Sequence, residues 1–285
     1  MSQPKNKSKS NNLSTIAVAL TLCLVCSVLV SAVAVGLKPK QTENVNLDRN
    51  RNILLAAGEL QEEDDSEVVK QKFADFEPRI IDLQTGKVAT DEQLKQAGIE
   101  DVNTYDTSSA SKIANLSNDL GDDDPASIGR VPKFAKVYVK EGANGATEAV
   151  VLPVYGYGLW GTIYGFLTIG SDMNTIEGIS FYSHKETPGL GARIEESEWR
   201  AQWKGISAYD EQGNVATGVT KAGNHKDNHV DGISGATLTG RGVNNFIQFW
   251  LSERGYKPFL DNMKEEGQIS AATANSINSS TDKEI

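Results

Sequence analysis

The chain has 285 residues, 39% of them hydrophobic, and a formal net charge of −10 at pH 7. This length allows one large domain or two small ones, and the modest hydrophobic share predicts solvated ends around a limited core. The first 40 residues hold five lysines and no acidic residue, so the rest of the chain carries a charge of −15. A body this acidic argues against nucleic acid as a partner.

An uncharged run of 23 residues, Thr15–Leu37, follows the N-terminal tail. As a helix it would be about 34 Å long, enough to cross a hydrocarbon core of about 30 Å. Ala32-Val33-Ala34 resembles the cleavage site of a signal peptide, but the run exceeds the roughly 7–15 apolar residues usual in such peptides. We therefore expect a retained transmembrane helix over residues 15–37, preceded by a tail, residues 1–14. Basic residues lie on both sides of the run, so charge leaves its orientation open.

Both cysteines, Cys23 and Cys26, lie within this run. The body therefore has no disulfide and no iron–sulfur cluster held by its own thiolates. The i, i+3 spacing places both thiols on one helix face, where a redox or metal role is the alternative to simple apolar packing. An apolar helix favours packing.

Residues 38–134 are expected to form a membrane-proximal region with an insertion. Early in this region, the segment Asn44–Gly58 ends in an apolar, helix-like run that Gly58 is predicted to stop. An acidic run at residues 62–67 is typical of a helix start or a solvated loop. Arg79–Leu83 predicts a short strand, and Ser108–Pro132, rich in Ser, Asp, Gly and Asn, predicts irregular structure.

The next region, residues 135–262, is expected to form the main domain, in which four strands alternate with short links. The predicted strands are Ala135–Lys140, Thr147–Val154, Gly161–Ile169 and Thr175–Ser183. The first pair and the second pair each flank a five- or six-residue polar link, which predicts two hairpins with antiparallel neighbours. Glu195–Gln202 predicts a helix. The fold class is therefore α+β, with a mostly antiparallel sheet and packed helices after one transmembrane helix.

A last helix is predicted after Thr237. Its apolar residues recur at helical spacing: Val243, Phe246, Ile247, Trp250 and Leu251. Gly255, after Arg254, predicts the end of this helix, and the sheet should pack one face on it. Residues 263–285 are polar, and we expect them to form a disordered tail.

Three hydroxyls lie at the start of this helix, within Asp231–Gly240: Ser234, Thr237 and Thr239. Unpaired N–H groups and the positive end of the helix dipole favour a phosphate there. Gly235 and Ala236 leave room for a large group to approach the backbone. The simpler alternative is an N-cap, since Ser or Thr before a helix is common. The residues by themselves favour the cap and do not single out one hydroxyl.

The same segment resembles the flavinylation motif Asp-x-x-Ser/Thr-Gly-Ala-Thr/Ser of proteins that carry FMN covalently. Each motif position is filled: Asp231, Ser234, Gly235, Ala236 and Thr237. The resemblance implies an FMN phosphoester on Thr237, the hydroxyl after the alanine. It also implies a partner during maturation, a separate flavin transferase that uses FAD.

Two more glycine-bearing segments stand out. Tyr155–Gly161 sets glycines beside aromatic residues, which suits a tight turn with a flat apolar surface; a hairpin corner with a core tryptophan is the alternative. In His184–Gly191, Pro188 fixes one backbone angle and Gly189 and Gly191 permit positive φ, so the loop has a defined shape. Such loops hold ligands, although an ordinary turn is the commoner outcome.

Together, GYGLWG, ETPGLG and SGAT are similar in order and sequence to the membrane-anchored FMN-binding subunits of ion-pumping redox complexes, over about Val137–Leu251. Within that family the chain resembles the C subunits of the Na+-translocating NADH:quinone oxidoreductase. The G subunits of the related ferredoxin:NAD electron-transport complex share the motifs and are the alternative. Asp48–Gly58 and the long insertion after it favour the C subunits.

The resemblance implies a redox subunit that acts within a membrane NADH:quinone oxidoreductase and relays electrons between an iron–sulfur centre and another flavin subunit. It implies other membrane subunits as partners, a bacterial inner-membrane location, a cytoplasmic N-terminal tail and a periplasmic flavin domain. No residue is expected to be catalytic in its own right or to bind a metal. The residues expected to bind FMN, besides Thr237, are Trp160, Glu186, Thr187, Leu190, Lys221, Ser234, Gly235 and Ala236.

Other functions receive less support from the sequence. The alternative from another functional class is an anchored extracytoplasmic binding module without a redox centre. The yellow colour of a bound flavin distinguishes the redox subunit from such a module. A hydrolase with Ser234 as nucleophile lacks the Gly-x-Ser-x-Gly flanks. His225 and His229 have an i, i+4 spacing, but no glutamate follows His225 and the body has no cysteine to complete a zinc site.

Overall fold

The structure is a computed structural model that describes residues 12–61, 63–143 and 145–267. The chain divides into two compact units, residues 1–47 and 48–285. The described part of the first unit is the N-terminal portion of α1 (Asn12–Ala56). This helix is long and apolar enough to cross a membrane, with a mean hydropathy of 2.7 in its most apolar window, and a signal sequence would satisfy the same criterion. The helix continues past Leu37 and through Pro39 instead of ending there.

The second unit is built on a six-stranded antiparallel sheet in the order β2-β1-β5-β6-β7-β8. The strands are β1 (Phe76–Asp82), β2 (Lys87–Val88), β5 (Phe134–Glu141), β6 (Thr147–Tyr157), β7 (Thr162–Gly170) and β8 (Ile176–Ser183). Both predicted hairpins, β5–β6 and β7–β8, are confirmed, and so is the α+β fold class. β1 extends three residues further towards the N-terminus than the predicted strand.

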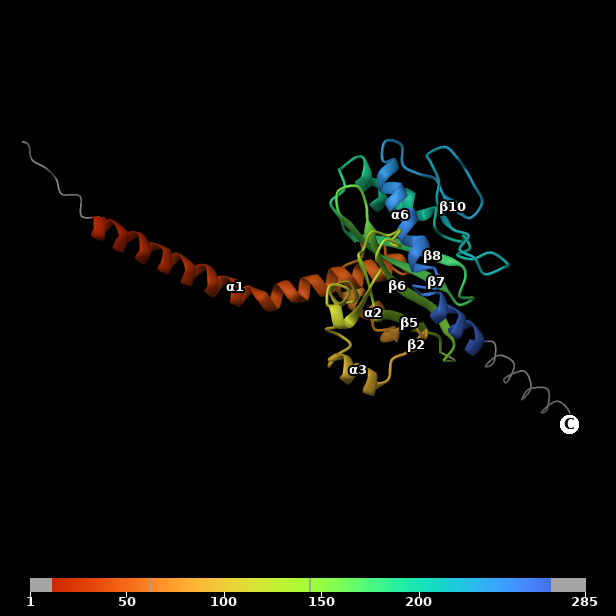
Figure 1. Ribbon diagram of the computed structural model, residues 1–285, viewed down its shortest axis with the longest axis horizontal. Coiled ribbons are helices and arrows are strands. Elements are labelled where there is room, and N and C mark those ends of the chain that lie inside the picture. Colours follow the sequence, from red (N-terminus) through yellow and green to blue (C-terminus); the bar gives the residue numbers. More distant parts are fainter. Residues whose placement is uncertain (1–11, 62, 144, 268–285) are drawn as a thin grey trace, which may run out of the picture. The chain divides into compact units, whose positions relative to one another are not determined.

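One face of the sheet is covered by α6 (Thr237–Trp250), as predicted from its apolar stripe (Figure 1). The indole Nε1 of Trp250 donates to the Tyr155 carbonyl at 2.7 Å, which fixes the helix on β6. Gly156 permits this approach, because a Cβ there would lie 2.4 Å from the Cβ of Phe246. The short helix α5 (Ser197–Ala201), which lies within the predicted helix Glu195–Gln202, adds the buried Trp199 to the same core.

The opposite face is covered by the last turns of α1 and by α2 (Ser66–Phe73) and α4 (Thr107–Ala110). The Ser180 hydroxyl of β8 donates to the Asn52 carbonyl of α1 at 2.7 Å. α1 ends at Ala56 and is stopped, as predicted, by Gly58, whose φ is +70°. Glu59 N–H bonds to the Leu54 carbonyl and Gly58 N–H to that of Leu55, which is a Schellman motif.

Part of the acidic run and part of the segment expected to be irregular form short elements. Asp65 caps α2 by accepting the N–H groups of Glu67 and Val68, so the acidic run begins a helix. Within residues 108–132 the chain continues α4, then forms η1 (Ala114–Leu116) and the paired strands β3 (Ser117–Asp119) and β4 (Arg130–Pro132). The remaining described elements are α3 (Asp91–Ala97), η2 (Gly191–Glu195), β9 (Gly218–Val219) and β10 (His229–Val230).

The predicted end of the last helix at Arg254 is wrong, because α6 ends at Trp250. The Tyr256 N–H donates to the Trp250 carbonyl at 2.6 Å, so the chain folds back on the helix end. A Cβ at Gly255 would lie 2.2 Å from the same carbonyl oxygen. Residues 257–267 are helical, and the remainder of the expected tail, from residue 268, lies outside the described residues, as do residues 1–11. The domain boundaries at 134/135 and 262/263 stay predictions.

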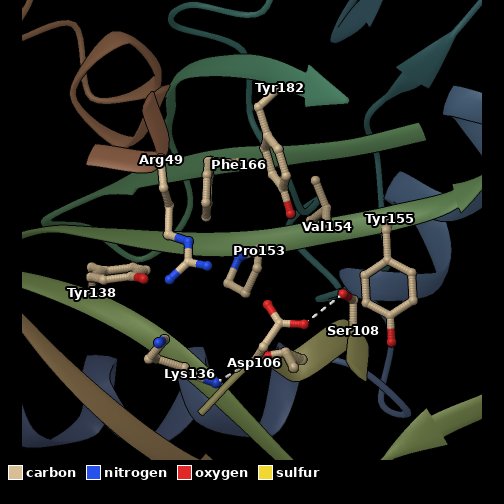
Figure 2. A pocket seen from close by; sticks show the side chains of 11 residues that line it. Arg49, Asp106, Ser108, Lys136, Tyr138, Pro153, Val154, Tyr155, Phe166 and Tyr182 are labelled. Carbon is tan, nitrogen blue, oxygen red and sulfur yellow. Dashed lines mark hydrogen bonds between the residues drawn. The ribbon is translucent and has the colours of Figure 1, made fainter. Parts of the chain in front are cut away.

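A polar cluster lies between the sheet and the elements on its α1 side (Figure 2). Arg49 of α1, Asp106 before α4 and Lys136 of β5 surround a cavity of about 20 Å³, together with the rings of Tyr138 and Tyr182. The Lys136 ammonium is buried and donates to the Asn103 carbonyl at 3.0 Å. Burial, with the neighbouring Arg49 charge as the second cause, lowers the pKa of Lys136 to about 8.

Lys136 should make stability depend on pH. Because its folded pKa of about 8 lies below the unfolded value of 10.5, the unfolded chain binds more protons between these values, and stability rises with pH there. Relative to Lys136→Met, the wild-type free energy of unfolding should rise by up to about 3 kcal/mol across this window. Denaturant titrations of both full-length proteins in detergent at several pH values measure the difference. Parallel pH profiles would contradict the prediction.

The contact between Gly156 and α6 predicts a second effect on stability. Gly156→Ala forces a methyl group against Phe246 and the Ala126 carbonyl, at 2.4 and 2.9 Å, and overpacking of this kind destabilises by about 1–3 kcal/mol. The matched control is Gly240→Ala in α6, where the nearest atom to a new Cβ is Val219 Cγ1 at 3.6 Å. The control should be neutral or stabilising by about 1 kcal/mol, since alanine is the better helix former. Equal unfolding free energies for the two variants would show that α6 does not pack this closely.

Candidate functional site

The three motif segments meet at the end of the sheet where β6 turns into β7. The turn at residues 158–161 joins these strands, the loop at residues 184–190 follows β8, and the third segment begins α6. Glu186 connects all three. Its Oε1 accepts the N–H groups of Leu159 and Trp160 at 2.9 and 3.0 Å, and its Oε2 accepts the Thr239 hydroxyl at 2.5 Å.

Glycines allow the segments to come this close. A Cβ on Gly158 would lie 2.6 Å from Glu186 Oε1, and one on Gly191 would lie 2.7 Å from Oε2 and 2.5 Å from the Thr239 hydroxyl oxygen. A Cβ on Gly242 would lie 2.4 Å from the Tyr157 carbonyl oxygen. The first turns of α6 therefore rest directly on the backbone of the turn that carries Trp160.

The start of α6 carries no side-chain cap. Thr237 is the first residue of the helix and Ala236 occupies the N-cap position. In the part of the chain that the structure describes, the N–H groups of Thr237 and Leu238 have no hydrogen-bond partner. The N-cap alternative is therefore wrong: Thr239 donates its hydroxyl to Glu186, and Ser234 and Thr237 remain exposed. The open N–H groups and the helix dipole make this end of α6 suited to a phosphate.

Exposed apolar side chains surround the helix start. Among the described residues beyond α1, seven large apolar side chains are exposed, and five of them belong to the motif segments: Tyr157, Leu159, Trp160, Leu190 and Leu238. Trp160 is 61% exposed and Leu190 46%. Leu190 also lies beside the flavinylation motif, because its Cδ2 would be 3.3 Å from a Cβ on Gly235. Exposed apolar surface next to a helix end with open N–H groups fits a ligand with a flat apolar ring and a phosphate.

The loop from Glu186 to Gly191 has the defined shape that its sequence predicts. The Thr187 carbonyl accepts the N–H groups of Leu190 and Ala192, both at 3.1 Å, and Gly189 has a φ of +72°. This turn holds Thr187 and Leu190 on the exposed side of the loop, while Glu186 is buried beneath it at 5% exposure. The loop therefore exposes Thr187 and Leu190 as candidate ligand contacts and buries Glu186, the residue that fixes the loop to the rest of the site.

Asp231 and Lys221 lie on a neighbouring loop pair. Asp231 Oδ1 accepts the Gly223 N–H at 2.7 Å, and a Cβ on Gly232 would lie 3.3 Å from the Lys221 carbonyl carbon. The Asp231 backbone is held in turn by Trp199 and Gln202, at 2.9 Å each. The structure thus assigns Asp231 to holding the Lys221–Gly223 turn against the start of the motif. The Lys221 side chain is exposed.

Sequence reasoning missed the roles of Thr239 and His184. Thr239 counted as one hydroxyl of three, and the structure shows it buried and hydrogen-bonded to Glu186. His184 accepts the Glu186 N–H on Nδ1 at 3.1 Å. The position of Thr239 within its motif does not reveal a partner 53 residues away. The partner of His184 lies only two residues away, but the glycine and proline pattern of the loop does not reveal how the imidazole is oriented. The polar cavity around Arg49 and Lys136, at about 20 Å³, holds about one water and is too small for a flavin.

Comparison with known proteins agrees with this geometry. Residues 158–252 match the model of the FMN-binding domain family. The C subunit of the Na(+)-translocating NADH-quinone reductase of Yersinia pestis is 44% identical over 221 residues, covering 76% of this chain and 80% of that protein. Its counterpart from Pseudomonas aeruginosa is 40% identical over 224 residues, covering 76% and 82%.

Solved structures agree as well. NqrC of Shewanella oneidensis superposes with a TM-score of 0.68 at 33% identity, covering 76% of this chain and 97% of that one. The C subunit of the Parabacteroides distasonis reductase superposes with a TM-score of 0.61 at 25% identity, covering 79% and 96%. With its FMN-binding region, its fold and identities of this size over most of its length, the chain belongs to the family of Na(+)-translocating NADH-quinone reductase C subunits.

Proposed function

We propose that this chain is the electron-carrying subunit of a membrane Na+-translocating NADH–quinone reductase and that it carries FMN as a phosphoester on Thr237. The observation that carries the proposal is the uncapped start of α6. There an exposed threonine hydroxyl and free N–H groups lie in the same site as the exposed Trp160 and Leu190, and Glu186 holds the segments together.

The surroundings of the three hydroxyls favour Thr237. Thr239 is 1% exposed and its hydroxyl is engaged by Glu186, so an incoming flavin does not reach it. Ser234 and Thr237 are both exposed, but Ser234 precedes α6, whereas Thr237 lies at the first position of the helix, where the free N–H groups can bind the phosphate. A flavin transferase would join the threonine oxygen to the FMN phosphorus of FAD. The pyrophosphate bond breaks, AMP leaves and the hydroxyl proton is released.

The other site residues have roles that follow from their positions. Trp160, Leu190 and Thr187 offer contacts for the ring, and Ser234, Gly235 and Ala236 let the phosphate approach the helix end. Lys221 supplies a positive charge, which favours an anionic reduced cofactor when it lies within about 4–6 Å. Bound FMN supplies the redox chemistry, and the tether keeps the cofactor in place in both oxidation states.

The exposure of this site to solvent suits a protein that relays electrons between partners. A ring that rests on the exposed Trp160 and Leu190 keeps one side open to redox partners, which are proposed to be an iron–sulfur centre and a second flavin subunit. The uncharged part of α1 is proposed to anchor the chain in the bacterial inner membrane with the body on the periplasmic side. The length and hydropathy of this helix support a membrane span.

Replacement of Thr237 tests the attachment. Thr237→Val keeps the shape of the side chain and removes its oxygen, so we expect a folded, colourless protein with no flavin mass, even when the transferase is present. Thr237→Ser keeps a nucleophilic oxygen and should retain part of the flavin. Intact mass and ultraviolet fluorescence after denaturing electrophoresis measure both. Peptide mapping that placed the flavin on Ser234 or Thr239 would overturn the assignment.

Protease accessibility tests the topology. Protease added to intact spheroplasts should cleave the body and leave a short membrane-bound stub, because a retained span with the proposed cytoplasmic N-terminus would place the body outside the cytoplasm. A cytoplasmic protein serves as the control for intact membranes. Full protection of the chain would show the reverse orientation, and release of a soluble body without protease would show a cleaved signal peptide.

A further inference from the structure

His184 lies directly after β8 and its side chain is 8% exposed. Its Nδ1 accepts the backbone N–H of Glu186 at 3.1 Å. Its Nε2 lies 2.9 Å from Oε1 of Glu195, without the alignment of a hydrogen bond. A ring nitrogen that accepts an N–H bond must keep its lone pair free, so these contacts assign the neutral ring with its proton on Nε2.

We propose that His184 is a positioning residue of the flavin site. Its Nδ1 fixes the backbone of Glu186, and Glu186 in turn fixes the turn at Leu159–Trp160 and the start of α6. The proposal rests on the proposed function in one respect, namely that Trp160 and Thr237 hold the flavin. No described hydrogen bond joins His184 to Trp160, Leu190 or Thr187, which are the residues proposed to contact the flavin ring.

The backbone bond matters because Glu186 is a buried carboxylate whose two oxygens accept three hydrogen bonds from two segments. Both oxygens must therefore meet fixed donors at once. A displacement of the Glu186 backbone changes the distances to Leu159, Trp160 and Thr239 together. The bond from Glu186 N–H to a side chain two residues earlier resembles an Asx turn, which is a rigid arrangement.

The contact of His184 Nε2 with Glu195 contributes less to holding the site than the bond that His184 Nδ1 accepts. The Glu195 side chain is 51% exposed, its contact with Nε2 lacks the alignment of a hydrogen bond, and a neutral imidazole forms no ion pair with it. Its carboxylate lies on the side of Nε2 and so favours a proton there. The bond that holds the site is therefore the one between Nδ1 and the Glu186 N–H.

Two substitutions distinguish the effect of the hydrogen bond to Nδ1 from the effect of filling the same space with a side chain. His184→Asn keeps an acceptor on the same branch of the side chain, and asparagine is the residue that accepts from the N–H two positions later in Asx turns. His184→Leu fills similar volume and has no acceptor. Both are made in the full-length chain, purified in detergent and produced without the flavin transferase, so that no flavin affects the result.

The measurement is amide hydrogen exchange of peptides that contain Glu186 and of peptides that contain Leu159 and Trp160. For His184→Leu we expect exchange about five- to tenfold faster in both, because loss of a hydrogen bond shifts local opening by about this factor. His184→Asn should restore slow exchange, and peptides from β5 should not change in either variant. If leucine leaves both regions slow, or if asparagine exchanges as fast as leucine, the Nδ1 bond does not position the site.

Two further measurements complete the test. Nitrogen NMR of the wild-type imidazole should show Nδ1 without a proton at neutral pH; a protonated Nδ1 would overturn the proposal even if His184→Leu fails to fold. In flavin-loaded chains, the visible spectrum and midpoint potential should shift in His184→Leu and return towards wild type in His184→Asn. Absence of flavin on Thr237 would overturn the proposed function, while the exchange results from flavin-free chains would still decide the role of His184.

Discussion

The buried carboxylate of Glu186 is the interaction on which the site depends. An isolated buried charge is costly, and here three donors satisfy it: two backbone N–H groups of the β6–β7 turn and the Thr239 hydroxyl of α6. These donors lie 26, 27 and 53 residues from Glu186 along the chain. A single side chain therefore joins a turn, a loop and a helix, and glycines supply the space that lets it do so.

The sequence predicted most of the elements and the pairing of the central strands, but not the individual hydrogen bonds that fix the helix ends and the site. Both central hairpins follow from short links between strands, and the buried face of α6 follows from the spacing of Val243, Phe246 and Trp250. The end of α6 was misplaced although the contact found there is local: the Tyr256 N–H bonds to the carbonyl of Trp250, six residues earlier, and the apolar spacing does not reveal this turn. The candidate site was found through resemblance to known motifs. Its internal geometry was not predictable, because the partner of Thr239 is a carboxylate in another segment and because none of the three hydroxyls forms the N-cap that was expected of one of them.

The sheet separates two chemically different environments. On the α6 side, the core is apolar up to the motif segments, where Trp160 and Leu190 become exposed. On the α1 side, Arg49, Asp106 and Lys136 share a small cavity beneath the tyrosines of β5 and β8. This arrangement keeps the strongly charged cluster away from the place where a flavin would rest. Changes in either environment can then be made and measured separately.

The short strand β2 affects how readily the sheet could pair with a strand of another molecule. It forms one edge of the sheet, pairs with β1 through Lys87 and Val88, and both of these residues are exposed. An edge of two residues offers few unpaired backbone groups, and a lysine on it opposes the approach of another strand. A second copy of the chain therefore finds few backbone groups on β2 with which to extend a sheet. Short, charged edge strands of this kind are a common means by which proteins limit the strand-to-strand association that leads to aggregation.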